Sequence, residues 1–312
     1  MSIIDRGRGT TPRGVSATRL VRFTAVMYKP QYLLYGILWT LAFEGTAAHL
    51  SGQQWRPGAA TVVRIVVVVI VLLYLRMVDE QKDLEYDRLH HPDRPLVTGA
   101  VTAADLRVGM AVISVVAVGV SALLSWGSAV AIAVVLAYGL GLWAAESMWP
   151  ALRDGVLVNL AITYPIQLLI AGYVLVSGIG TGQIDADGRV GWAVLIVAAA
   201  FLQFEFARKI SRRPRPGEMY YSNAVGAWPA VGVSLGLVAV AVGASLVALA
   251  PWQFGGWPAA LGWLPLATAM IPGPAAVAFR RGGDDYSPVP AVIFVLALYL
   301  ELIVAVLVVP AS

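Results

Sequence analysis

A run of acidic residues between Asp79 and Asp93 is the part of this sequence best suited to chemistry. Six of the 18 acidic residues lie there, and the segment begins Asp79-Glu80-Gln81-Lys82-Asp83-Leu84-Glu85-Tyr86-Asp87. Asp79, Asp83 and Asp87 are four apart, so a helix would place them on one slowly drifting face. Oxygen ligands of this kind suit Mg²⁺, which binds one or two carboxylates together with substrate phosphates. The pattern predicts a Mg²⁺ site for a phosphorylated substrate; the alternative is a solvated acidic loop paired with nearby basic residues.

The composition places this cluster in a membrane protein. The chain of 312 residues is 59% hydrophobic and 13% charged, with a mean hydropathy of +0.75. An average soluble domain is about 45–50% apolar and about 25% charged. A water-soluble fold of this size could not bury so much apolar side chain. The absence of cysteine excludes a disulfide scaffold and thiolate metal sites.

Apolar segments long enough to cross a bilayer recur along the chain. A hydrocarbon core about 30 Å thick needs ~20 residues per helix. Nine segments qualify, at roughly 31–50, 59–78, 106–124, 128–148, 155–177, 190–210, 224–248, 259–279 and 288–309. The eighth is the weakest, because Pro265, Pro272 and Pro274 interrupt it. We therefore expect an all-α integral membrane protein.

The distribution of basic residues predicts the orientation of these helices. With the N-terminus inside, 19 of the 22 lysine and arginine residues lie on the inner side, and Arg56, Arg64 and Arg189 lie outside. This asymmetry follows the positive-inside rule and requires an odd number of spans. It also accounts for the net charge of +4 without a nucleic-acid partner. We expect residues 1–30 to be a basic cytoplasmic segment, and residues 31–312 to form one nine-helix bundle in the plasma membrane, with its C-terminus outside.

Three glutamates lie within the apolar segments, where ionisable residues are costly. Glu44 and Glu301 fall nearer the outer half, so hydrogen bonding between helices is the expected role. Glu146 falls near the inner end of the fourth segment. Asn159, Tyr164 and Gln167 form a polar strip on the fifth segment, which either lines a cavity or makes hydrogen bonds that hold helices together.

The acidic motif, followed by Arg94-Pro95-Leu96 and Gly99, resembles the first aspartate-rich motif of the UbiA superfamily of intramembrane prenyltransferases. In that family the motif usually reads Asn-Asp-x-x-Asp-x-x-x-Asp, then Arg-Pro-Leu and a glycine; here Asp79 and Glu80 take the first two places. The resemblance covers the whole chain, since the family has nine helices with this motif after the second.

This resemblance implies an isoprenyl diphosphate bound through Mg²⁺ at the cytoplasmic mouth of the bundle, with its tail in an apolar tunnel. Ionisation of the diphosphate would give an allylic cation, which a lipid or aromatic acceptor captures. A terpene cyclase, in which an alkene of the prenyl chain captures the cation, is the alternative within the same fold. A secondary transporter is a remote alternative. That class predicts inverted repeats and broken helices that meet at the bilayer midplane, whereas the polar residues of this sequence gather at the inner mouth.

The family's second aspartate motif is altered in this chain. The expected position after the sixth segment holds Glu205, Arg208 and Lys209, followed by Tyr221, and contains no Asp-x-x-x-Asp. The chain therefore resembles a divergent branch, in which Arg208 or Lys209 contacts the diphosphate directly. The alternative is ordinary positive-inside anchoring.

The resemblance implies a set of site residues for each role. The expected metal ligands are Asp79, Glu80, Asp83, Asp87 and Glu205. The expected diphosphate-binding residues are Arg22, Lys82, Arg94, Arg153, Arg208, Lys209 and Tyr221. The expected catalytic residues are Asp79, Asp83, Asp87, Arg208 and Lys209. Arg153 is included because Trp149-Pro150-Ala151-Leu152-Arg153 resembles the family's Tyr-Pro-x-x-Lys-Arg turn.

The orientation can be tested with a single cysteine, because the chain has none of its own. We expect a cysteine at Ser2 to be protected from a membrane-impermeant thiol reagent in intact cells and to react after permeabilisation. Reaction in intact cells would overturn the predicted topology.

Overall fold

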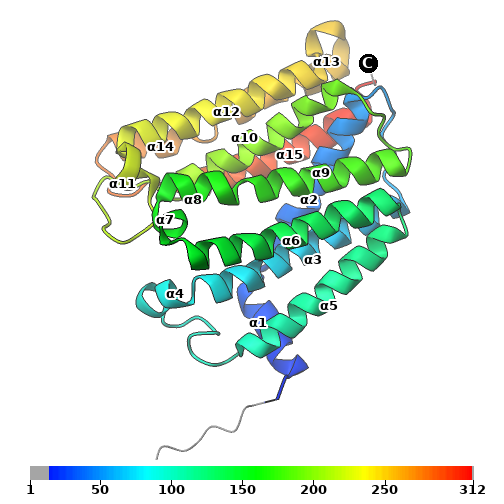
Figure 1. Cartoon of the computed structure of the whole chain (residues 1–312). Helices are drawn as coiled ribbons and strands as arrows, with labels where there is room; N and C mark the ends of the chain where they lie inside the picture. Colours follow the sequence, from blue (N-terminus) through cyan, green and yellow to red (C-terminus); the bar gives the residue numbers. More distant parts are fainter. Residues whose placement is uncertain (1–13, 311–312) are drawn as a thin grey trace, which may run out of the picture.

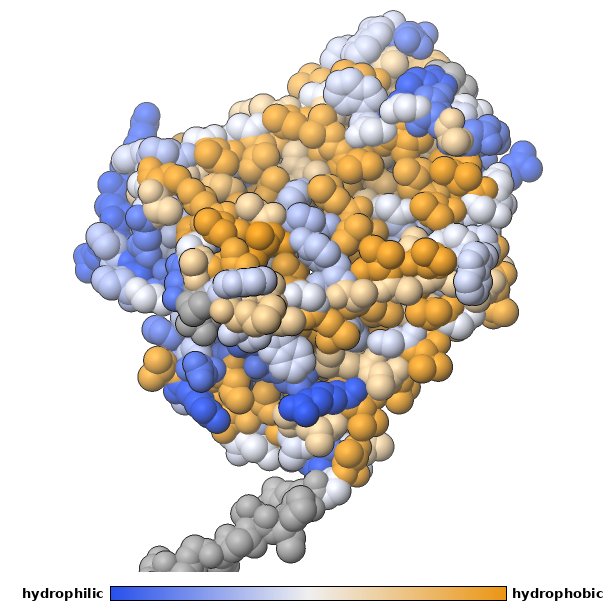
Figure 2. All heavy atoms as spheres, in the orientation of Figure 1, coloured by the Kyte–Doolittle hydropathy of each residue, from blue (hydrophilic) through white to orange (hydrophobic). Residues whose placement is uncertain are grey.

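The computed structural model describes residues 14–310, and the side chains within them except those of Pro150 and Arg153. Helices make up the regular structure of this range, and the long ones run alongside one another as a bundle (Figure 1). Only helices or closed barrels satisfy their backbone polar groups inside a bilayer. An apolar band lies between the more polar ends of the bundle (Figure 2).

The long helices coincide with the expected apolar segments. They are α2 (Pro30–Leu50), α3 (Ala59–Lys82), α5 (Ala103–Ala122), α6 (Trp126–Met148), α10 (Gly191–Ala207), α12 (Ala227–Leu249) and α15 (Val289–Val308). Two further spans are each divided in two: α8 (Val156–Thr163) with α9 (Pro165–Gly180), and α13 (Gly256–Thr268) with α14 (Gly273–Arg280). The short helices are α1 (Ala17–Met27), α4 (Leu84–His90), α7 (Pro150–Asp154) and α11 (Tyr221–Val225).

Within the described range, eight segments are long and apolar enough to cross a membrane. The first expected segment, α2, has 21 residues but is less apolar, because it carries Thr40, Glu44, Thr46 and His49, all of which are buried in the bundle. The chain is thus a multi-pass integral membrane protein, and the count of nine spans stays a prediction.

Prolines explain both divided spans. Pro165 is the first residue of α9, and its missing N–H and bulky ring disfavour an uninterrupted helix. Pro272 and Pro274 lie at the start of α14, where the eighth expected segment was weakest. The second interruption was expected from the sequence, whereas the break at Pro165 was not.

The helices α4, α7 and α11 gather at one end of the bundle, together with the last turns of α3, α6, α10 and α14 (Figure 1). We call this the aspartate end, because the acidic motif lies there. The connection between α9 and α10 and the turn between α12 and α13 lie at the opposite end (Figure 1).

A buried ion pair joins three helices toward the opposite end. Glu44 on α2 and Arg64 on α3 are both 0% exposed, with Arg64 Nη1 2.8 Å from Glu44 Oε2. Thr61 and Trp55 donate hydrogen bonds to Glu44 at 2.6 and 3.1 Å, and Arg64 Nε donates to Ser177 Oγ on α9 at 2.8 Å. Glu44 therefore bonds between helices, as expected, and Arg64, which the topology argument counted among the outer charges, is buried against it.

Glu301 also makes the expected contact between helices. Thr268 Oγ1 on α13 donates a hydrogen bond to Glu301 Oε1 on α15. Both residues lie within apolar spans, so this bond partly satisfies a carboxyl group that would otherwise be unpaired in a membrane helix.

Removing Arg64 should destabilise the whole protein. Breaking one partner of a buried ion pair leaves an uncompensated charge and costs roughly 3–5 kcal/mol. We therefore expect Arg64→Leu to lower the midpoint of thermal unfolding in detergent clearly, whereas Arg56→Leu, at an exposed position of the same end, should not. Equal unfolding midpoints for the two variants would contradict this role of the pair.

Candidate active site

The acidic motif lies across a bend between two helices. Asp83 stands between α3 and α4, and its N–H bonds to the carbonyl of Asp79 at 2.8 Å. The side chains of Asp79 and Asp83 are 47% and 38% exposed, whereas those of Glu80 and Asp87 are 1% and 2% exposed. The expected ladder on one helix face is therefore divided into a partly exposed pair, Asp79 and Asp83, and a buried pair, Glu80 and Asp87.

The two partly exposed aspartates and the buried Glu146 surround one ammonium. Lys82 Nζ lies 3.8 Å from Asp79 Oδ1, 3.9 Å from Asp83 Oδ1 and 3.3 Å from Glu146 Oε2. Glu146, close to the end of α6, also accepts a hydrogen bond from Asn159 Nδ2 on α8 at 3.0 Å. Burial raises the pKa of Asp83 to about 6, against the opposing effect of Lys82 and with the support of neighbouring carboxylates.

The buried group holds the shape of the motif. Arg94 Nη1 lies 3.0 Å from Glu80 Oε1 and 2.6 Å from Asp87 Oδ2, and Arg76 binds the same oxygen of Glu80. Burial raises the pKa of Asp87, and the charge of Arg94 opposes that effect. Arg94, expected to bind the diphosphate, thus ties α4 and the following loop to α3.

The altered second motif forms its own charged group. Glu205 lies 2.7 Å from both Arg208 Nε and Lys209 Nζ, and the Tyr221 hydroxyl donates to it at 3.1 Å. Tyr221 stacks on Phe206, with ring centroids 4.3 Å apart. Burial lowers the pKa of Lys209, although Glu205 opposes the effect. Glu205, expected to bind a metal, is paired with two cations in this structure.

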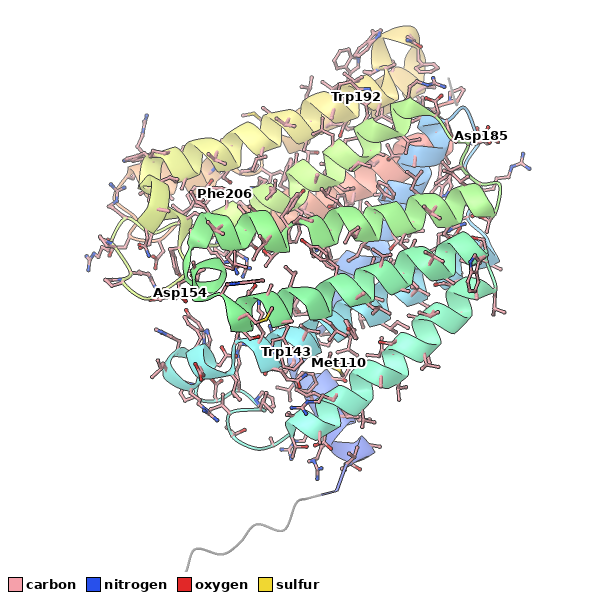
Figure 3. All side chains as sticks on the ribbon, viewed as in Figure 1. Met110, Trp143, Asp154, Asp185, Trp192 and Phe206 are labelled. Carbon is pink, nitrogen blue, oxygen red and sulfur yellow. The ribbon has the colours of Figure 1, made fainter. Side chains whose placement is uncertain are left out.

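The two motifs face each other at the aspartate end. Lys209 is within electrostatic range of Asp83, and Tyr86 on α4 is within range of Glu218 and Tyr220, which precede α11. Phe206 and Asp154, labelled in Figure 3, mark this end, whereas Asp185 and Trp192 lie toward the opposite one. Segments more than 100 residues apart in the sequence thus lie close together at this end.

One of the expected diphosphate-binding residues, Arg22, lies outside this group. Arg22 is exposed on α1, which is held to α5 by an ion pair of 2.7 Å between Arg19 and Asp105. No contact among the described residues brings Arg22 to the acidic motif. The side chain of Arg153 lies outside the described part of the chain.

The remaining basic residues after α10 bind a neighbouring loop. Arg213 pairs with Asp284 at 3.0 Å and Arg215 with Asp285 at 2.7 Å. Arg212 stacks on the ring of Phe279 at 4.8 Å from its centroid. Their contacts join the connection before α11 to the connection before α15, so they have structural partners besides any anchoring role.

Glu146 and Arg76 are the site residues that the sequence reasoning did not assign. Glu146 was recognised as a costly acid within an apolar span, and Asn159 as part of a polar strip. Glu146 and Asn159 lie near the ends of two consecutive spans on the predicted inner side, and this shared position could have indicated that they belong to the site. The contacts of Glu146 with Lys82 and with Asn159 depend on how α3, α6 and α8 pack.

The described residues contain no group of three or more histidine or acidic side chains arranged to hold a metal ion. The donors nevertheless suit Mg²⁺, because Asp79 and Asp83 are exposed carboxylates one turn apart, and Glu80 Oε2 is buried without a hydrogen-bond partner. Mg²⁺ commonly keeps one or two carboxylates and takes its other ligands from phosphates and water. The residues therefore fit an ion that shares its coordination with a diphosphate.

Comparison with solved structures shows which fold this is. A UbiA homolog from Aeropyrum pernix K1 aligns with a TM-score of 0.64 at 18% identity, over 87% of this chain and 97% of its own. A digeranylgeranylglyceryl phosphate synthase aligns with a TM-score of 0.60 at 14% identity, over 94% and 99%. A UbiA homolog from Archaeoglobus fulgidus bound to DMAPP and Mg²⁺ gives 0.56 at 15% identity, over 88% and 98%.

No protein-family model and no curated protein sequence matches the chain. The likeness is therefore one of tertiary structure, and it extends over nearly the full length of each solved neighbour. The chain has the fold of the UbiA homologues.

Proposed function

We propose that this protein is a Mg²⁺-dependent prenyltransferase that moves an isoprenyl group from its diphosphate to a lipid or aromatic acceptor. The observation that carries the proposal is that Asp79 and Asp83, whose side chains are partly exposed, lie at the same end of the bundle as Arg208 and Lys209, with Lys209 within electrostatic range of Asp83. The fold supports it, because one solved neighbour binds DMAPP and Mg²⁺ and another binds GPP and Mg²⁺.

The acidic and basic groups have complementary roles in this reaction. The carbon–oxygen bond of the allylic diphosphate breaks with its electron pair on the diphosphate, and the acceptor supplies the pair for the new bond and loses a proton. Asp79 and Asp83 would hold Mg²⁺, which neutralises the diphosphate. Arg208 and Lys209 would bind the leaving group as its negative charge grows, where preorganised charges are most effective.

The charges at the aspartate end explain how one metal ion could suffice. Among the described side chains, the carboxylates are Asp79, Glu80, Asp83, Asp87, Glu146 and Glu205, and the cations within 4 Å of them are Arg76, Lys82, Arg94, Arg208 and Lys209. The site is therefore close to neutral before substrate binds. The basic pair replaces the charge of a second metal ion in this proposal.

The same proposal assigns the membrane orientation. Of the 22 lysine and arginine residues, 19 fall in segments predicted to lie on the same side of the membrane as the acidic motif. By the positive-inside rule, the aspartate end would therefore face the cytoplasm. The N-terminus would lie on that side and the C-terminus on the other.

Asp83→Ala should abolish transfer without unfolding the protein. The substitution removes a metal ligand that the buried, arginine-paired Asp87 cannot replace. Product formation would be measured with C15 and C20 prenyl diphosphates, with and without an aromatic acceptor. Glu85→Ala, an exposed acid on α4, serves as the matched control and should stay near wild type.

If Asp83→Ala is expressed normally and its activity is within a few-fold of wild type, the proposed metal site would be wrong. The acidic motif would then be a solvated loop paired with nearby basic residues. A cyclic hydrocarbon formed by the wild type without acceptor would select the cyclase alternative over transfer.

The basic pair should matter for turnover, whereas the neighbouring arginine should not. Loss of a donor to a developing anion typically costs ~2.7–4 kcal/mol, or about 10²–10³ in rate. We expect Arg208→Ala and Lys209→Ala to lower kcat and kcat/KM by about that factor, since the interaction is strongest in the transition state. Arg213→Ala, whose partner is Asp284, should stay near wild type. Similar kinetics for all three variants would contradict a role of Arg208 and Lys209 in catalysis and would support the alternative that they only anchor the helix by the positive-inside rule.

A further inference from the structure

Glu146 is a buried carboxylate whose partners come from two other helices. Its side chain is 2% exposed, near the end of α6 and one turn after the labelled Trp143 (Figure 3). Lys82 Nζ from α3 lies 3.3 Å from it, and Asn159 from α8 donates to it at 3.0 Å. An ionised carboxylate at such a site is stable only with a cation and hydrogen-bond donors around it. Lys82 is thus its charge partner.

Lys82 is shared between that buried carboxylate and the two exposed aspartates. Glu146 is nearer than Asp79 and Asp83, at 3.3 Å against 3.8 and 3.9 Å. A divalent cation on the aspartates would repel the ammonium, since like charges a few ångströms apart interact strongly near a protein interior. To stay at the edge of the site, the Lys82 ammonium then needs the attraction of another anion, one that does not bind the metal.

We propose that Glu146 is a positioning residue, which holds the Lys82 ammonium beside the Asp79–Asp83 pair so that it binds the diphosphate instead of competing with the metal. This inference rests on the proposed function. Glu146 is suited to the task because it is buried behind the aspartates and fixed by Asn159, which also donates to the carbonyl of Leu152 at 3.3 Å. Without its charge, the aspartates are the only anions that remain within 4 Å of Lys82 in the described structure.

Glu146→Gln provides the direct test. The amide keeps the size of the side chain but removes the charge, so Lys82 should move toward Asp79 and Asp83 and hinder metal binding. The probe is Mn²⁺ in the presence of inorganic pyrophosphate, titrated against the purified protein and followed by electron paramagnetic resonance. We expect the half-saturating Mn²⁺ concentration to rise roughly tenfold, as is typical when the partner of a site residue is lost.

A double variant separates positioning from general damage. In Glu146→Gln/Lys82→Met the competing ammonium is absent, so Mn²⁺ affinity should return to about the wild-type level. The KM for the prenyl diphosphate should remain raised, because its cation is missing. A merely structural Glu146 would not allow a second loss to restore metal binding. Glu301→Gln, which removes a carboxylate from another apolar span, is the matched control and should bind Mn²⁺ like wild type.

Wild-type Mn²⁺ affinity in Glu146→Gln would overturn the inference, as would a double variant that binds no better than the single one. If Glu146→Gln does not fold, Glu146→Asp takes its place: the charge stays but the reach shortens, and unchanged Mn²⁺ affinity would again overturn the inference.

Asp83→Ala in the same titration keeps this inference separate from the proposed function. If Asp83→Ala binds Mn²⁺ and pyrophosphate normally, the proposed metal site itself is wrong. If Asp83→Ala loses binding while Glu146→Gln does not, only the role of Glu146 is refuted.

Discussion

The aspartate end depends on one electrostatic constraint: a carboxylate at the edge of an apolar bundle needs a nearby cation. Burial penalises the charged form, and pairing offsets that penalty. Glu80 and Asp87 share Arg94, the exposed aspartates and Glu146 share Lys82, and Glu205 is paired with two cations. Each of these carboxylates therefore has a cation within 4 Å, and the motif is not an isolated acidic patch.

These pairs also decide which helices meet. The contact of Lys82 with Glu146 joins α3 to α6, and Asn159 adds α8. Arg94 returns the loop after α4 to the end of α3. On the other side, the hydroxyl of Tyr221 joins α11 to Glu205 on α10. The contacts that join these helices therefore come in part from side chains to which the proposed function assigns metal and diphosphate binding.

The ion pair of Glu44 and Arg64 satisfies the same constraint with a different result. Both side chains are fully buried, and their partners come from the surrounding helices and the turn that follows α9. No exposed carboxylate takes part, so this pair fixes helices to one another. The difference between the two ends lies in exposure: Asp79 and Asp83 remain open to a ligand, whereas Glu44 does not.

Much of the fold could be predicted from the sequence, because the length and apolarity of a span are local properties. The positions of the long helices, the weak eighth span and the bonding of Glu44 and Glu301 between helices all follow from residues close in sequence or from the cost of charge in a membrane. The acidic motif was also recognisable from spacing alone. The break at Pro165 was missed although the proline was visible, since prolines are tolerated within membrane helices.

The sequence did not predict which acidic and basic side chains pair with one another. Spacing suggested that Asp79, Asp83 and Asp87 share one face, but Asp87 is buried against Arg94 whereas Asp79 and Asp83 are partly exposed. Arg64 was taken for an outer-side charge and is buried with Glu44. The partnership of Lys82 with Glu146 joins residues 64 positions apart. The sequence determined which residues are costly to leave unpaired, and only the packing of helices distant in sequence decided which cation each carboxylate received, because such pairing depends on distances across helix interfaces.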